Sequence, residues 1–259
     1  MEKDLDIIIK GINKGSFCKA DVKERYVSLA HFVTLQSMEC VKLTESYMPD
    51  GYASDSKIFI WLPTPDKSRD QQAEYVATAR ALIDRLTAEI PNAEVVIDLR
   101  CNIGGVLSTF IDAILPFIIE GITALADGIY MYGKDASNNK IAKFYINQNN
   151  EHVIDVDGDL IVSKLTPAKP VKCSNISILC NKYTMSSGEI LCMVFRYLGE
   201  LGNFACKIYG EKTRGLTNGC VEKTLGNTKV MVPVYYLCCG NRCYRNGVDG
   251  MLPISKIKL

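Results

Sequence analysis

The sequence predicts an α/β protein, because short apolar runs alternate with segments whose apolar residues have helical spacing. Its 259 residues are 47% apolar and 23% charged, which is a globular composition and enough length for a large core. Two apolar runs, 93–100 and 174–181, each lead through a turn rich in small residues into an apolar helix. Repeated units of strand, turn and helix favour a sheet with parallel strands and helices packed on it.

The first 55 residues are expected to form a small helical cap. Apolar residues between Tyr26 and Val33 have helix-compatible spacing, and the turn-rich stretch MPDGYASDS follows. The core domain is predicted over residues 56–259. Its first strand is KIFIWLP, which starts at Lys57.

The rest of the core is predicted from periodicity. Apolar residues recur at steps of three and four between Asp66 and Ile90, which predicts an amphipathic helix that Pro91 ends. The segments IYMYG, KIAKFYI and DLIVSKL are typical of short strands, and NNEHVIDVDGD (149–159) is expected to be a polar excursion between them. KVMVPVYYLCC and GMLPISKI add strands near the C-terminus.

Charge and hydropathy exclude several classes of partner. Thirty Lys and Arg against 29 Asp and Glu give a net charge of +1, so nucleic acid is not expected as a partner. A membrane span needs about 20 successive apolar residues. The nearest stretch, Phe110 to Met131, is interrupted by Asp112, Glu120 and Asp127, so we interpret it as a buried helix followed by a strand.

The cysteines and the N-terminus favour a reducing, cytoplasmic location. The 11 cysteines are dispersed and odd in number, and the first residues do not match a secretory signal. Cys238, Cys239 and Cys243 form a local cluster without the paired CxxC or Cys–His spacing of zinc sites. Neighbouring strand residues point to opposite faces, so these thiols are predicted to be buried apolar groups. No metal, no cofactor and no particular oligomeric state is predicted.

Two turns carry the candidate chemistry, RCNIGG (100–105) and TMSSGE (184–189). Each is expected to follow a buried strand and to open a helix, where a serine hydroxyl can be exposed and free N–H groups can face an oxyanion. This geometry suits acyl transfer. The alternative is structural, since Ser186 with Glu189 also has the spacing of a helix capping box.

Four segments together resemble the ordered blocks of the C-terminal processing, or tail-specific, serine peptidases. They are VVIDLRCNIGG, SILCNKYTMSSGEI, IYGEKTRGLTNG and NGVDGMLPI. The pattern is most similar to the nisin resistance protein-like members, which lack a PDZ module. The resemblance implies a ClpP/crotonase-like core of βα units and hydrolysis of peptide bonds in a peptide or protein substrate.

The resemblance also implies roles for individual residues. Ser186 corresponds to the nucleophile, and the backbone N–H of Ser187 would be one donor of the oxyanion hole. Gly104 or Gly105 would supply the second N–H. Glu189 would hold a neighbouring group in place.

The general base is where this chain departs from the family pattern. Ser-Lys members have a lysine directly after the glycine of the third block, and here Leu216 has that place, so a Ser-Lys dyad is disfavoured. Lys212 is most simply a solvated charge. The nisin resistance branch uses a histidine from the N-terminal part, which favours His31 over His152. The alternative is that His31 is an ordinary half-buried residue.

Two other functions stay open at this point. A catalytically inactive relative could keep the groove as a peptide-binding module, which the missing lysine would explain. An esterase could use the same serine.

Overall fold

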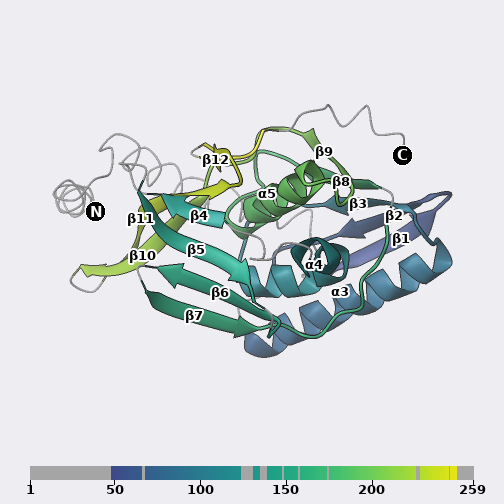
Figure 1. Cartoon of the computed structure of the whole chain (residues 1–259), viewed down its shortest axis with the longest axis horizontal. Helices are drawn as coiled ribbons and strands as arrows, with labels where there is room; N and C mark the ends of the chain where they lie inside the picture. Colours follow the sequence, from purple (N-terminus) through teal and green to yellow (C-terminus); the bar gives the residue numbers. More distant parts are fainter. Residues whose placement is uncertain are drawn as a thin grey trace.

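Two β-sheets and three helices form the part of the chain that the computed structural model describes (Figure 1). The described residues are 48–65, 68–123, 131–134, 139–147, 149–156, 158–173, 175–225, 228–244 and 246–249. The predicted helical cap up to residue 47, including His31, lies outside them. The protein is therefore an α/β protein over its described residues.

The first sheet has the strand order β1-β2-β3-β8-β9. Its strands are β1 (Asp50–Ser54), β2 (Lys57–Trp61), β3 (Glu94–Asp98), β8 (Asn175–Cys180) and β9 (Ala205–Gly210). The last four are parallel, and β1 is antiparallel to β2. Val95, Val96 and Ile97 of β3 are all buried, as expected for a strand covered on both faces.

Three helices cover one face of this sheet, with α4 between α3 and α5 (Figure 1). They are α3 (Arg69–Glu89), α4 (Leu107–Thr123) and α5 (Ser187–Glu200). The apolar spacing along α3 is confirmed at Val76, Ala79, Ile83 and Leu86, which are buried. Ile90, at the end of the predicted face, is half-buried. None of the described helices combines the length and apolar character that a membrane crossing requires.

The second sheet is antiparallel and has the order β10-β11-β4-β5-β6-β7, with β12 paired to β11. Its strands are β4 (Met131–Lys134), β5 (Lys140–Ile146), β6 (Glu151–Val156), β7 (Asp159–Lys164), β10 (Asn218–Leu225), β11 (Thr228–Cys239) and β12 (Arg242–Tyr244). The predicted strands KIAKFYI and DLIVSKL correspond to β5 and β7.

Two segments differ from the sequence predictions. Residues 50–54, within the range predicted for the cap, form β1, so the core sheet starts before Lys57. The predicted polar excursion at 149–159 is wrong, because it forms most of the β6–β7 hairpin and buries His152 and Val153. Several of its polar residues, Glu151, His152 and Asp155, lie within β6, whereas Asn150 and Gly158 lie in turns.

The cysteine prediction is also corrected. Cys238 and Cys243 form a disulfide, because they lie directly opposite each other on β11 and β12, with their Cα atoms 4.0 Å apart. The prediction of buried thiols rested on Cys238 and Cys239, which are neighbours along one strand. The bond instead joins Cys238 to Cys243 across a hairpin. Cys239 is a buried free thiol, as predicted, and burial raises its pKa.

Candidate active site

The candidate residues gather at the carboxyl edge of the parallel strands. The segments that leave β3 and β8 run side by side, since the Leu99 N–H donates to the Leu179 carbonyl at 2.9 Å. The segment after β9 joins them, because the Arg214 N–H donates to the Thr184 carbonyl at 3.0 Å. Ligand sites of sheets with parallel strands commonly lie at this edge.

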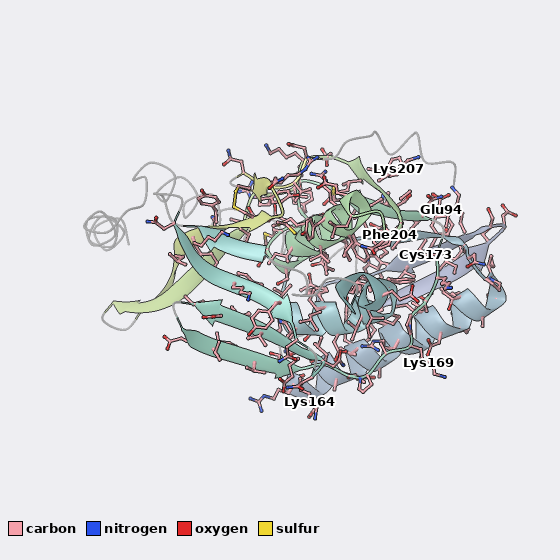
Figure 2. The ribbon with its side chains drawn as sticks, in the orientation of Figure 1. Glu94, Lys164, Lys169, Cys173, Phe204 and Lys207 are labelled. Carbon is pink, nitrogen blue, oxygen red and sulfur yellow. A yellow bond between two sulfur atoms is a disulfide. The ribbon has the colours of Figure 1, made fainter. Side chains whose placement is uncertain are left out.

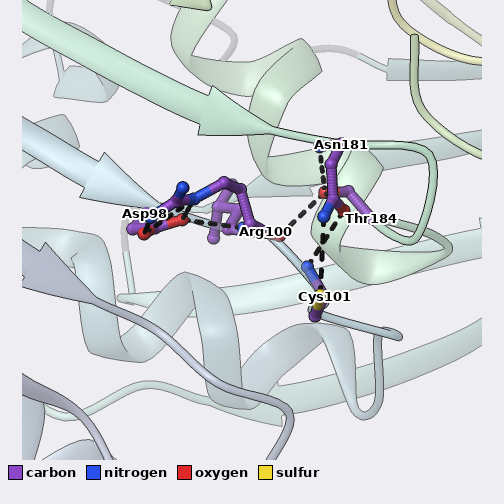
Figure 3. A network of polar contacts seen from close by, with 6 residues as sticks. Asp98, Arg100, Cys101, Asn181 and Thr184 are labelled. Carbon is purple, nitrogen blue, oxygen red and sulfur yellow. Dashed lines mark hydrogen bonds and ion pairs between the residues drawn. The ribbon is translucent and has the colours of Figure 1, made fainter. Parts of the chain in front are cut away.

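A polar network locks the two predicted turns together (Figure 3). The amide oxygen of Asn181 accepts the Cys101 N–H at 3.1 Å, and the Thr184 hydroxyl donates to the Leu99 carbonyl at 2.8 Å. Cys101 has a φ of 60°, a left-handed conformation that this bond to its N–H helps to hold. Beside the network, Arg100 pairs with the Asp98 carboxylate.

Ser186 has a strained backbone and lies between a strand and a helix. It is the N-cap of α5, with φ 52° and ψ −124°, a conformation that non-glycine residues rarely adopt. Its side chain is half-buried, so a substrate can approach the hydroxyl. Its N–H donates to the Glu189 carboxylate at 2.9 Å. The Glu189 N–H donates to the Ser186 carbonyl.

Gly104, the first glycine of the pair, lies directly against Ser186. A methyl group on Gly104 would lie 2.6 Å from the Ser186 Cβ and 3.0 Å from the Ser187 nitrogen. Gly104 and Gly105 have φ values of 90° and 146°, which favour glycine. At position 104, the close approach of Ser186 and the positive φ therefore both require glycine.

Asn102 fixes the start of this glycine turn, and sequence reasoning missed it. It is fully buried, and its amide nitrogen donates to the Leu62 carbonyl at the end of β2. Its amide oxygen accepts the Gly104 N–H at 2.9 Å, and its carbonyl accepts the Met185 N–H at 2.9 Å. An amide side chain directly before Ile103 and the glycine pair was the available signal.

The predicted oxyanion donors differ in whether their N–H groups already have an acceptor among the described residues. Within the described residues, neither the Ser187 N–H nor the Gly105 N–H donates a hydrogen bond. The Gly104 N–H is occupied by Asn102. Of the two glycines, Gly105 is therefore the one with a donor to offer.

Glu189 connects the nucleophile turn to the loop after β9. It is fully buried, and its Oε1 accepts the Thr213 hydroxyl at 2.6 Å and the Gly215 N–H at 2.7 Å. Its Oε2 accepts the N–H groups of Ser186 and Leu216. Burial raises the pKa of Glu189, and these four donors oppose that shift by stabilising the carboxylate.

The structure gives other roles to the residues that bear on the choice of the general base. Leu216, at the position of the family lysine, binds Glu189 through its backbone. Lys212 is exposed and pairs with the exposed Asp249 at 3.3 Å, which agrees with a solvated charge. His152 belongs to β6 in the second sheet, where burial lowers its pKa to about 4.

A cleft of about 550 Å³ lies elsewhere, between α3, α4 and the connection that follows β7. Lys164, the last residue of β7, and Lys169 of this connection lie along α3 (Figure 2). Arg80 of α3 pairs with Asp112 of α4 and donates to the Thr166 carbonyl, which ties the connection down. None of the predicted site residues lines this cleft, so we place the candidate site by its chemistry.

No group of three or more His, Cys, Asp or Glu side chains that could hold a metal occurs in the described part of the chain.

Comparison with protein families identifies the chain. The family model of peptidase family S41 matches residues 72–247, which is more than half of the sequence and includes both turns. The chain belongs to peptidase family S41. The sequence analysis predicted a member of the C-terminal processing serine peptidases, and this prediction is confirmed at the level of the family. Sequence comparison with curated proteins gives no match.

Several solved structures are similar to this chain at low sequence identity. A lipoprotein from Streptococcus agalactiae is 15% identical with a TM-score of 0.56, and the match covers 82% of this chain and 67% of that one. A putative S41 protease from Bacteroides fragilis is 15% identical with a TM-score of 0.51, covering 79% and 49%. The photosystem II D1 C-terminal processing protease is 17% identical with a TM-score of 0.49, covering 82% and 45%. The chain therefore spans about half the length of the last two proteins.

Proposed function

We propose that the protein hydrolyses peptide bonds in peptide or protein substrates, with Ser186 as the nucleophile. The observation that carries the proposal is the strained backbone of Ser186 at the start of α5, together with the close approach of Gly104 to the Ser186 Cβ. A helix cap alone explains neither the positive φ nor the close approach of the glycine. An acyl-transfer site needs both, because the hydroxyl must be exposed beside oxyanion donors.

The proposed oxyanion hole consists of the N–H groups of Ser187 and Gly105. Both N–H groups are free of other acceptors within the described residues. Ser187 belongs to the nucleophile turn, and the Gly105 carbonyl accepts a hydrogen bond from the Ser187 hydroxyl. Gly104, the other predicted donor, instead gives its N–H to Asn102 and makes room for Ser186. Loss of one such donor typically lowers kcat by about 100- to 1,000-fold.

In the proposed mechanism, Ser186 Oγ attacks the substrate carbonyl while a general base takes its proton. We assign that role to His31, since Leu216 removes the family lysine and His152 is buried in another sheet. The protonated base then gives its proton to the leaving amine, and water hydrolyses the acyl-enzyme. Glu189 positions the nucleophile through the Ser186 N–H.

We also propose that the first sheet and its helices are the ClpP/crotonase-like core implied by the sequence. Support comes from four parallel strands in which a helix follows β2, β3 and β8.

The test compares Ser186→Ala with Ser177→Ala. Ser177 is a matched control, because it is a buried serine of β8 whose hydroxyl donates to Glu94. Labelling by a fluorophosphonate probe and cleavage of fluorescent casein are measured for both variants. We expect Ser186→Ala to lose labelling and cleavage while the control keeps them. Cleavage by Ser186→Ala at the wild-type rate would exclude Ser186 as the nucleophile.

The same assays separate the alternatives. A peptide-binding module would retain labelled peptides uncut and would not react with the probe. An esterase would hydrolyse p-nitrophenyl esters but not the matched anilides. For the base, His31→Ala is expected to lower kcat at least 100-fold, and unchanged kcat would remove His31 from the mechanism.

A further inference from the structure

We propose that the Ser187 hydroxyl is a positioning group for the oxyanion hole. This inference rests on the proposed function. Its role is separate from that of the Ser187 N–H, since the side chain acts on the opposite turn. Ser187 Oγ donates to the Gly105 carbonyl at 2.8 Å, and the side chain is only 3% exposed. One residue thus offers one donor and orients the residue that offers the other.

The glycine turn needs such a restraint because two glycines in succession have wide backbone freedom. The Gly105 N–H lies between two anchored groups of this turn. On one side, the Gly104 N–H is bonded to the Asn102 amide. On the other side, the Gly105 carbonyl is bonded to Ser187 Oγ. The N–H between these two anchors is therefore aimed by both.

The two anchors differ in how easily they are lost. Asn102 is fully buried and has further bonds to the β2 end, so its anchor belongs to the core. Gly105 itself is exposed, so water can replace a missing partner of its carbonyl. Removing the Ser187 hydroxyl would leave the fold intact and allow the backbone on both sides of the Gly105 Cα to rotate. Catalysis would then lose the preorganisation of one oxyanion donor.

The expected kinetic signature follows from when the oxyanion exists. Its charge develops in the transition state, so a misdirected Gly105 N–H lowers kcat and leaves KM nearly unchanged. We expect Ser187→Ala to lower kcat about 10- to 100-fold, which is less than complete loss of a donor. Ser187→Thr keeps a hydroxyl and is expected to recover most of the activity.

The experiment uses the full chain and combines activity with a direct measurement on the turn. Casein cleavage and the rate of fluorophosphonate labelling are compared for wild type, Ser187→Ala, Ser187→Thr and the control Ser177→Ala. The control also loses one hydrogen bond of a buried serine hydroxyl. In parallel, ¹⁵N relaxation of the Gly105 amide reports its mobility without requiring activity.

Support requires that Ser187→Ala slows both reactions, that the control does not, and that the Gly105 amide becomes more mobile only in Ser187→Ala. Unchanged kcat or an unchanged Gly105 amide in Ser187→Ala would overturn the inference. Equal losses of kcat in Ser187→Ala and Ser177→Ala would also overturn it, because they would indicate a general loss of stability. An inactive wild type would instead refute the proposed function, and the amide measurement would still decide whether Ser187 orders the turn.

Discussion

His152 gives the fold a specific sensitivity to acid. Its side chain is 3% exposed on β6, and its neighbours across the sheet, Ile146 and Ser163, carry no charge that could stabilise an imidazolium. Burial lowers its pKa from 6.5 to about 4. The unfolded chain therefore binds a proton at a pH where the folded chain does not.

The sign and size of the effect follow from this difference. The stability contributed by neutral His152 is fully present above about pH 6.5 and is lost as the pH falls toward 4. The complete loss is about 3 kcal/mol, at about 1.4 kcal/mol for each pH unit. Between pH 7.5 and pH 5, the expected loss is about 2 kcal/mol.

Urea unfolding followed by the fluorescence of Trp61, the only tryptophan in the sequence, measures this loss. The matched variant is His152→Leu, which removes the titrating group but keeps an apolar side chain. Carboxylates also titrate in acid, so the decisive quantity is the difference between the pH slopes of wild type and variant. We expect the variant to lose about 2 kcal/mol less than wild type. Equal slopes would show that His152 is accessible to protons in the folded protein.

Three further predictions concern other parts of the fold. Gly104→Ala is expected to lower activity on the order of 100-fold, because the new methyl would lie 2.6 Å from the nucleophile's Cβ. Gly158→Ala has a similar positive φ but no atom within 4 Å, and an equal effect there would point to strain alone. Arg80→Ala is expected to lower the free energy of unfolding by about 3 kcal/mol, since it leaves the Asp112 charge unpaired. Urea titration checks this, and a double variant without both charges should lose less than the sum of the single losses. Cys243→Ser removes a disulfide that closes a short loop, so we expect a loss of about 2 kcal/mol, and an unchanged Tm would contradict it.

The parts predicted well from the sequence are those with a local signal. The apolar run that forms β3 and the spacing along α3 each identify one element without knowledge of its neighbours. The two turns were found for the same reason, because each combines a buried strand, small residues and a following helix. Their bonded contact, through Asn102 and Met185, depends on the sheet order and could not be derived locally.

The parts predicted poorly depend on partners distant in the sequence. The hairpin at 151–164 is polar in composition, yet pairing with β5 buries His152. The Cys238–Cys243 bond requires a hairpin register that no spacing rule specifies. Glu189 was expected to hold a neighbouring group in place, whereas it accepts four hydrogen bonds from two segments.

The carboxylate of Glu189 makes the reactive turn and the loop at 213–216 a single cooperative unit. Because the same two oxygen atoms bind Ser186, Thr213, Gly215 and Leu216, disorder in that loop would withdraw support from the serine backbone at once. The alignment of the Ser186 hydroxyl therefore depends on a loop that is synthesised later in the chain. A chain truncated before residue 213 would retain Ser186 but would lose the three hydrogen bonds from the loop at 213–216 that hold Glu189 beside it.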